Sequence, residues 1–183
     1  MLKSILRNWY RDLLWALLSV VFWSWIFMLL TDTTAKNKVT IYADLPAIAD
    51  EKLELALEES MPQSIRFVKA HAFTYAMFDE SAVLKGDLYL VSEHYVDEFL
   101  ASFVPIDRDR FPNATFYEKD GTAYGICVYD PATGLCAAKG LVGYIESERC
   151  YLFFNEASGH LGAWNGSPDD AAIAVAQAFL GLQ

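Results

Sequence analysis

The stretch Asp87-Leu-Tyr-Leu-Val-Ser-Glu93 decides the fold class, because it joins two kinds of secondary structure within seven residues. Leu88 to Val91 is a continuous apolar run, which is typical of a strand buried on both faces of a sheet. Ser92 follows directly and can cap a helix over Glu93–Phe103, where large apolar side chains recur at helical spacing. A strand that leads straight into a helix is the building unit of α/β sheets.

Other segments of the chain repeat this alternation. β-branched and aromatic runs predict strands, and apolar residues at helical spacing behind a capping residue predict helices. The predicted strands are Val39–Ala43, Ser64–Lys69, Asp87–Val91 and Cys150–Phe154, with a hairpin over Thr122–Ala138 that turns at Asp130–Thr133. The other predicted helices are Glu51–Ser60, capped by Asp50, and Pro168–Leu182, capped by Ser167. The pattern predicts an α/β fold, with an open, mostly parallel sheet and helices on both faces.

The N-terminal region differs sharply from the rest of the chain. Leu13 to Leu30 contains 18 residues without a charged side chain, and a helix of that length spans about 27 Å, close to the hydrocarbon thickness of a bilayer. A signal peptide is the alternative, but its apolar region is shorter, and only Thr33-Thr34-Ala35 resembles a cleavage site. We therefore expect one uncleaved transmembrane helix over residues 13–31.

Charge on either side of this segment predicts its orientation. Lys3, Arg7 and Arg11 precede it, and Lys36 and Lys38 follow it. The three preceding basic residues lie in a short tail that needs no translocation. Residues 1–12 would then be cytoplasmic, residues 32–38 a tether, and residues 39–183 an extracytoplasmic domain. The chain would be a single-pass membrane protein with its N-terminus in the cytoplasm.

The predicted domain is strongly acidic. The whole chain has a formal charge of −10, and its first 12 residues carry three basic and one acidic side chain, so the remainder carries −12. Binding nucleic acid depends on Lys and Arg side chains that displace counterions from phosphate. The composition therefore argues against a nucleic-acid partner.

Four short segments of the domain share motifs with one protein family. They are the opening strand and turn Lys38–Pro46, the Gly-Asp entry to a strand in Leu84–Ser92, the Pro-Ile-Asp helix exit in Phe103–Asp107, and Asp120-Gly-Thr-Ala-Tyr-Gly125. Together they resemble the first lobe of extracellular solute-binding proteins with the type 2 periplasmic-binding fold, the receptors of ABC importers. The resemblance covers residues 38–130.

The chain departs from that family in length. In the family a second lobe of comparable size follows, and the ligand is held between the lobes. Only about 50 residues follow position 130 here, and a single lobe cannot close like a two-lobed clamp. We expect a membrane-tethered recognition domain that binds a small polar ligand or a partner protein. The alternative is a structural or assembly subunit of a membrane complex with no small-molecule ligand.

Topology suggests where a ligand would bind. Ligands of open α/β sheets bind outside the carboxyl ends of the strands. Asp44 ends the first predicted strand, and Ser92 and Glu93 follow the third. Tyr124 lies on the segment that resembles the family's cleft-lining strand. Asp44 is equally well explained as a turn residue and Ser92 as a helix cap, so both interpretations stay open.

Trp164 is a fifth candidate ligand-binding residue. It lies in the glycine-rich segment Gly159–Ser167, before a predicted helix. Helix N-termini bind anions, and aromatic side chains on loops often contact ligands. Asp169 and Asp170 already supply negative charge at this terminus, which favours the alternative of a structural loop whose Trp164 covers the edge of the core.

The predicted hairpin also suggests a disulfide. With a four-residue loop over Asp130–Thr133, Tyr129 would face Gly134 and Cys127 would face Cys136. A Cys127–Cys136 bridge becomes feasible in an oxidising compartment. Cys150 would then remain a free thiol in a buried strand.

No motif in the sequence indicates an enzyme. The histidines His71, His94 and His160 lack the spacing of a metal site, and there is no nucleophile elbow, P-loop or dinucleotide-binding fingerprint. The sequence therefore predicts a protein without catalytic residues, metal or cofactor.

Overall fold

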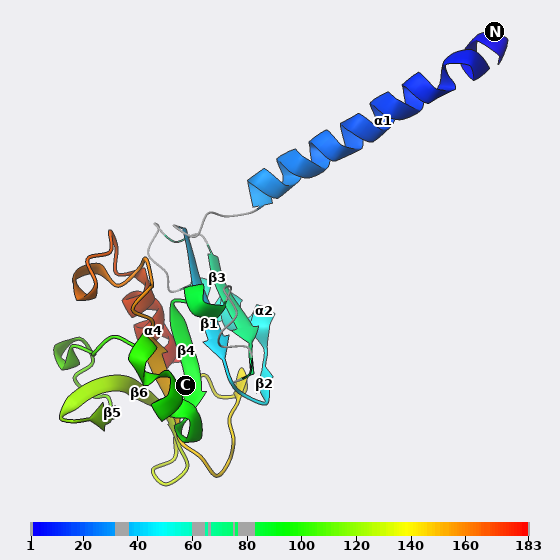
Figure 1. Cartoon of the computed structure of the whole chain (residues 1–183). Helices are drawn as coiled ribbons and strands as arrows, with labels where there is room; N and C mark the ends of the chain where they lie inside the picture. Colours follow the sequence, from blue (N-terminus) through cyan, green and yellow to red (C-terminus); the bar gives the residue numbers. More distant parts are fainter. Residues whose placement is uncertain are drawn as a thin grey trace. The chain divides into compact units, whose positions relative to one another are not determined.

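The computed structural model describes residues 2–31, 37–59, 65, 67–74, 76 and 83–182, in two units, Met1–Thr34 and Ala35–Gln183 (Figure 1). The first unit contains helix α1 (Leu2–Thr31). Its segment Trp9–Phe27 is long and apolar enough to cross a membrane, and its large apolar side chains other than Ile26 are exposed. An apolar N-terminal helix of this kind is compatible with an anchor or a signal sequence.

The second unit is built around one sheet of short strands. The strand order is β3-β1-β4-β9-β6-β5, and β7 also pairs with β6. Figure 1 labels β3, β1, β4, β6 and β5 of this sheet. The bounds are β1 (Lys38–Ala43), β3 (Phe67–Ala72), β4 (Leu88–Ser92), β5 (Phe116–Lys119), β6 (Thr122–Asp130), β7 (Leu135–Cys136) and β9 (Cys150–Phe154). A second, two-stranded sheet joins β2 (Ala47–Ile48) to β8 (Val142–Gly143).

The sheet is mixed, and the prediction of a mostly parallel sheet is wrong. Among the described strands, β1 is parallel to β3 and β4, whereas β9 is antiparallel to both β4 and β6. β9 enters beside the carboxyl end of β4, where Ser92 pairs with Cys150 and the N–H of Glu93 donates to the carbonyl of Arg149 at 2.9 Å. A buried apolar run such as Cys150–Phe154 fits either direction, so the sequence pattern does not reveal it.

Apolar clusters cover both faces of the sheet. Successive side chains of a strand point to opposite faces. Along β4, Leu88 and Leu90 join the cluster that includes α2 (Asp50–Glu58) and α4 (Ala171–Gly181), while Tyr89 and Val91 join the cluster that includes α3 (Val96–Phe99). Helices therefore contribute to the core on both faces.

The segment after β4 is not the continuous helix predicted over Glu93–Phe103. It forms a 3₁₀ turn (Glu93–Tyr95), then α3, then a second 3₁₀ turn (Leu100–Ser102). Ser92 has the extended backbone of a capping residue, but its side chain makes no capping hydrogen bond. The approach of β9 supplies a backbone acceptor for the N–H of Glu93, so this N–H has a partner without a side-chain cap.

The predicted caps of α2 and α4 are also wrong. Ala49 precedes α2, and Asp50 lies in its first turn, where its charge complements the helix dipole. Ser167 donates its hydroxyl to the carbonyl of Ser158 at 3.0 Å rather than capping α4. α4 begins at Ala171, three residues later than predicted, because the segment before it is bonded to the preceding loop.

The hairpin has a different register from the predicted one. Tyr129 pairs with Cys136 and Asp130 with Leu135, so the loop begins after Asp130. The Asp130 side chain accepts the N–H of Ala132 at 2.9 Å, which fixes the turn one residue later than expected. Cys127 therefore does not face Cys136, and Cys127, Cys136 and Cys150 are all free thiols. The predicted disulfide is absent.

Candidate functional site

A pocket of about 590 Å³ lies along β1 and is closed on one side by the loop between β9 and α4. We call it the amino-edge pocket, because Lys38 begins β1 and Asp87 directly precedes β4. Residues that contribute to its wall include Lys38, Tyr42, His71, Lys85, Asp87 and His160. They come from four separate parts of the chain, so the pocket exists only in the folded domain.

Asp87 is the centre of the pocket's polar wall. It is only 5% exposed. Its Oδ2 accepts the N–H of Thr40 at 2.8 Å, and its Oδ1 accepts the hydroxyl proton of Ser158 at 2.6 Å. The Ser158 Oγ in turn accepts the N–H of His160 at 3.1 Å. Two charge-assisted hydrogen bonds therefore fasten the loop of Ser158 and His160 to the start of β1.

His160 fastens the same loop to α4. Its ring is buried, and Nδ1 lies 2.7 Å from Oδ1 of Asp169. A carboxylate accepts, so we infer that Nδ1 carries the proton. The Asp169 Oδ1 also accepts the N–H of Ala171, and the His160 carbonyl accepts the N–H of Ala172 at 3.0 Å. We call the set Asp87, Ser158, His160 and Asp169 the clasp.

Burial raises the pKa of Asp87 above its ordinary value. The hydrogen bonds from Ser158 and Thr40 and the nearby His160 lower this pKa, and Asp169 raises it, but desolvation is the largest influence and the net direction is upward. The carboxylate is thus costly to bury, and its hydrogen bonds offset part of that cost.

The clasp contains the residue types of a catalytic triad but not its arrangement. In a triad the imidazole takes the proton of the serine hydroxyl. Here the Ser158 hydroxyl donates to Asp87, its Oγ accepts from the His160 backbone, and the His160 ring lies against Asp169. In this geometry the Ser158 hydroxyl donates to Asp87 rather than to the His160 ring, and the bonds hold the loop in place.

Asn155 fixes the entry to β4 beside the pocket. Its Nδ2 donates to the carbonyls of Leu84 and Gly86 at 2.8 and 2.7 Å. A Cβ at Gly86 would lie 2.4 Å from the Tyr42 ring, so only glycine fits this close approach. The backbone around Lys85 is thereby held at the edge of the pocket.

Three of the five predicted ligand-binding residues lie together at the opposite edge of the sheet. Asp44 and Ser92 lie at the carboxyl ends of the neighbouring parallel strands β1 and β4, and the N–H of Asp44 donates to Leu90 at 2.9 Å. Glu93 follows and lies 3.9 Å from Arg149. The Asp44 Oδ2 is shielded from solvent without a hydrogen-bond partner in the described part of the chain, and burial raises its pKa. A ligand role for these residues stays a prediction.

Tyr124 and Trp164 do not join that group. Gly125, next to Tyr124, pairs with Phe153 near the end of β9, which is the end that lies beside the start of β4. Tyr124 is therefore near the amino edge, because β6 runs in the same direction as β4. The Trp164 ring packs 5.0 Å from that of Phe154, between centroids, and is half-buried.

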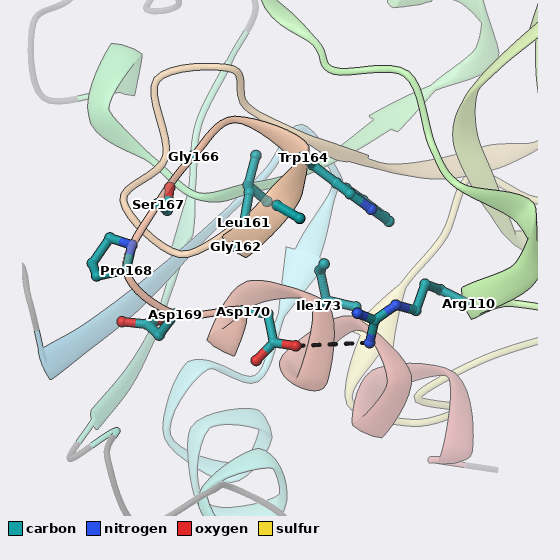
Figure 2. Close-up of a pocket in the computed structure, with 11 residues that line it drawn as sticks. Arg110, Leu161, Gly162, Trp164, Gly166, Ser167, Pro168, Asp169, Asp170 and Ile173 are labelled. Carbon is teal, nitrogen blue, oxygen red and sulfur yellow. Dashed lines mark ion pairs between the residues drawn. The ribbon is translucent and has the colours of Figure 1, made fainter.

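Trp164 instead lines a smaller pocket of about 390 Å³ at the start of α4 (Figure 2). Arg110 reaches across this pocket to Asp170, with 3.7 Å between Nη1 and Oδ2. The Arg110 guanidinium thus already lies beside one of the carboxylates at the helix start. The described geometry fits the structural interpretation of the loop as well as the ligand-binding one.

Comparisons with known proteins assign no family to the chain. No family model and no curated protein matches the sequence. Among solved structures, thiaminase I from Bacillus thiaminolyticus aligns with a TM-score of 0.34 and 13% identity, over 48% of this chain and 27% of that chain. This chain thus aligns with about a quarter of that protein's length. So distant a likeness carries no conclusion about function.

Proposed function

We propose that the chain is a non-enzymatic, membrane-tethered recognition domain that acts outside the cytoplasm and binds a small polar ligand in the amino-edge pocket. The clasp carries this proposal. Its bonds hold the pocket wall in one arrangement before any ligand arrives, which lowers the entropic cost of binding. The apolar helix α1 supports the tether.

A thermal-shift screen of the full chain in detergent tests the proposal. The panel holds neutral sugars, amino acids, short peptides and small organic acids. A compound that binds only the folded state stabilises it by about 2.7 kcal/mol at one hundred times its Kd, or about 5 to 11 °C for a domain of this size. If no compound raises the Tm, the binding proposal is wrong.

Two glycine variants locate the site. Gly159 lines the amino-edge pocket, and a Cβ there meets nothing within 4 Å. Gly159→Leu should fill the pocket and abolish the ligand-induced shift. Gly181→Leu, at the end of α4, also adds a side chain into open space and serves as the matched control. A ligand shift that survives Gly159→Leu unchanged would mean that the compound binds elsewhere.

The alternative, a structural subunit without a ligand, has less support. A sheet edge that accepts a partner strand needs free backbone N–H groups. At the edge strand β3, the N–H groups of Val68 and Ala70 already donate to Glu58 and Glu54 of α2. Strand addition at this edge is therefore disfavoured.

A further inference from the structure

Positive charge is scarce in the acidic domain. Residues 35–183 contain 11 Lys and Arg residues against 22 Asp and Glu residues. Of the nine basic residues that the structure describes there, five lie within 4 Å of a carboxylate, namely Lys69, Arg108, Arg110, Lys119 and Arg149. Within the described residues, four lysines have no ion pair: Lys38, Lys52, Lys85 and Lys139.

Two of these four lysines line the same pocket. Lys38 starts β1 and Lys85 ends the 3₁₀ turn Val83–Lys85. They are 47 positions apart in the sequence, yet both line the amino-edge pocket. Lys52 and Lys139 line none of the pockets described above. The domain has twice as many acidic as basic residues. Two ammonium groups that have no ion pair among the described residues therefore form a local reversal of charge at the amino-edge pocket.

The other polar groups of the pocket are compatible with this reversal. Asp87 also lines the pocket, and its negative charge opposes one of the two ammonium groups, so positive charge is still in excess among the lining residues. Both its oxygens already accept hydrogen bonds from Thr40 and Ser158. His71 adds an exposed ring that can donate a hydrogen bond. A concave site with walls of low dielectric constant concentrates the field of its charges, so an anion gains more there than on an open surface.

We infer that the amino-edge pocket selects a small anion, a carboxylate or a phosphate, which binds between Lys38 and Lys85. This inference rests on the proposed function and deepens it, because it names the chemical class of the ligand. The anion is either a free solute or the headgroup of an acidic phospholipid. Both sources offer the same charged oxygens to the two lysines.

The test uses the full chain in nanodiscs of phosphatidylcholine at constant ionic strength. Succinate and inorganic phosphate are the probes, and succinamide is a neutral compound of nearly the same shape as succinate. Succinate or phosphate should raise the Tm, while succinamide, and sodium chloride at the same ionic strength, should not. In nanodiscs that contain phosphatidylglycerol, a raised Tm and weaker succinate binding would identify the lipid as the source. An unchanged succinate affinity there would identify a free solute.

Matched double variants assign the effect to the two lysines. K38Q/K85Q should weaken the binding of the active probe at least about tenfold. K52Q/K139Q removes the same net charge from the other two unpaired lysines and should change the affinity less than about twofold.

Four results would overturn the inference. Equal loss in both double variants would show that net charge alone attracts the probe, and full binding by K38Q/K85Q would show that the probe binds elsewhere. If a neutral compound of the screen binds in the pocket while neither anion does, the choice of ligand class is wrong but the recognition function stands. If nothing binds, both proposals fall.

Discussion

Asp87 directly precedes β4 and Asp44 directly follows the neighbouring strand β1, and these two carboxylates have opposite surroundings. Both oxygens of Asp87 accept hydrogen bonds, from the Thr40 backbone and the Ser158 hydroxyl. The Asp44 Oδ2 has no hydrogen-bond partner among the described residues. Burial raises the pKa of both groups, but only at Asp87 does a network depend on the carboxylate.

The same substitution should therefore have opposite effects at the two positions. Asp87→Asn replaces an acceptor with an NH₂ group facing a donor, and should cost about 1 to 3 kcal/mol of unfolding free energy, or about 2 to 4 °C in Tm per kcal/mol. Asp44→Asn removes a poorly solvated charge and should raise the Tm at pH 7. Melting of both variants in the same detergent decides the matter, and shifts of the same sign would contradict the assigned roles.

Asp87 should also make stability depend on pH. Because its pKa is raised above 3.8 in the folded protein, the folded state binds more protons than the unfolded state just above that pH. The contribution of Asp87 to stability is therefore greatest below pH 3.8 and falls as pH rises through the folded pKa. In the Asp87→Asn variant the side chain at position 87 does not titrate. The difference in unfolding free energy between the wild type and this variant should therefore shrink from about pH 4 to pH 7. Urea unfolding of both proteins at several pH values measures this difference in free energy. A difference that grows with pH would contradict the raised pKa of Asp87.

The three cysteines should differ in reactivity. Burial raises the pKa of Cys127 to about 11 and raises that of Cys150 as well, and the thiolate is the reactive form. Cys136 is only half-buried. With a colorimetric thiol reagent at pH 8, one thiol should react quickly in the folded chain, and all three after unfolding without reductant. The Cys136→Ser variant should lose the quickly reacting thiol of the folded chain. A total of one reactive thiol after unfolding would instead support the predicted Cys127–Cys136 disulfide.

At the scale of elements, α2 shields the free edge of β3. Glu54 accepts the N–H of Ala70 at 3.0 Å and also contacts Lys69 at 2.7 Å, and Glu58 accepts the N–H of Val68 at 3.2 Å. Edge strands with free N–H groups pair with other chains, so these glutamates protect the domain from association.

Removal of a glutamate that covers the edge of β3 should lower the free energy of unfolding and promote association between chains. Glu54→Ala should cost about 1 to 2 kcal/mol, since it leaves the partly buried N–H of Ala70 without its acceptor. Glu59→Ala removes the same charge from an exposed position at the end of α2 and is the control. Calorimetry and light scattering of the two variants test the idea. Equal scattering from both would show that the edge is protected in another way.

Local sequence predicts the strands better than their connections. Val39–Ala43 and Cys150–Phe154 match β1 and β9 within one residue, because β-branched and aromatic side chains specify buried strands locally. The direction of β9, the interrupted helix after Ser92 and the hairpin register depend on hydrogen bonds to distant residues. The periodicity of apolar residues in the sequence does not predict hydrogen bonds between distant residues.

The candidate site shows the same limit. The topology rule leads to Asp44 and Ser92 at the carboxyl edge, and both lie there. The clasp joins Asp87 and Ser158, which are 71 positions apart in the sequence. In the sequence alone, His160 cannot be distinguished from the other two histidines. A charged residue immediately before the apolar run Leu88–Val91 was the one local signal, since a carboxylate so close to a buried strand needs a partner.

For the whole molecule, the decisive question is whether α1 remains attached to the domain. Trp9–Phe27 is apolar enough to span a membrane, and we predict that the full chain stays in the membrane fraction after carbonate extraction. Arginine near the centre of a spanning helix costs about 2.5 to 3.5 kcal/mol per residue. Leu18→Arg combined with Val21→Arg should therefore prevent stable insertion and move the chain out of the carbonate-resistant fraction.

The matched control distinguishes loss of insertion from loss of folding. Leu18→Ala combined with Val21→Ala changes the same positions without adding charge, so this chain should stay in the membrane. If α1 is instead a cleaved signal sequence, mass spectrometry will find a soluble wild-type form that begins near Lys36, and the anchor prediction is then wrong. In that case the acidic domain would still present Lys38 and Lys85 at the amino-edge pocket, because β1 begins after the cleavage point. The tether and the anion site are thus separable, and each can fail without the other.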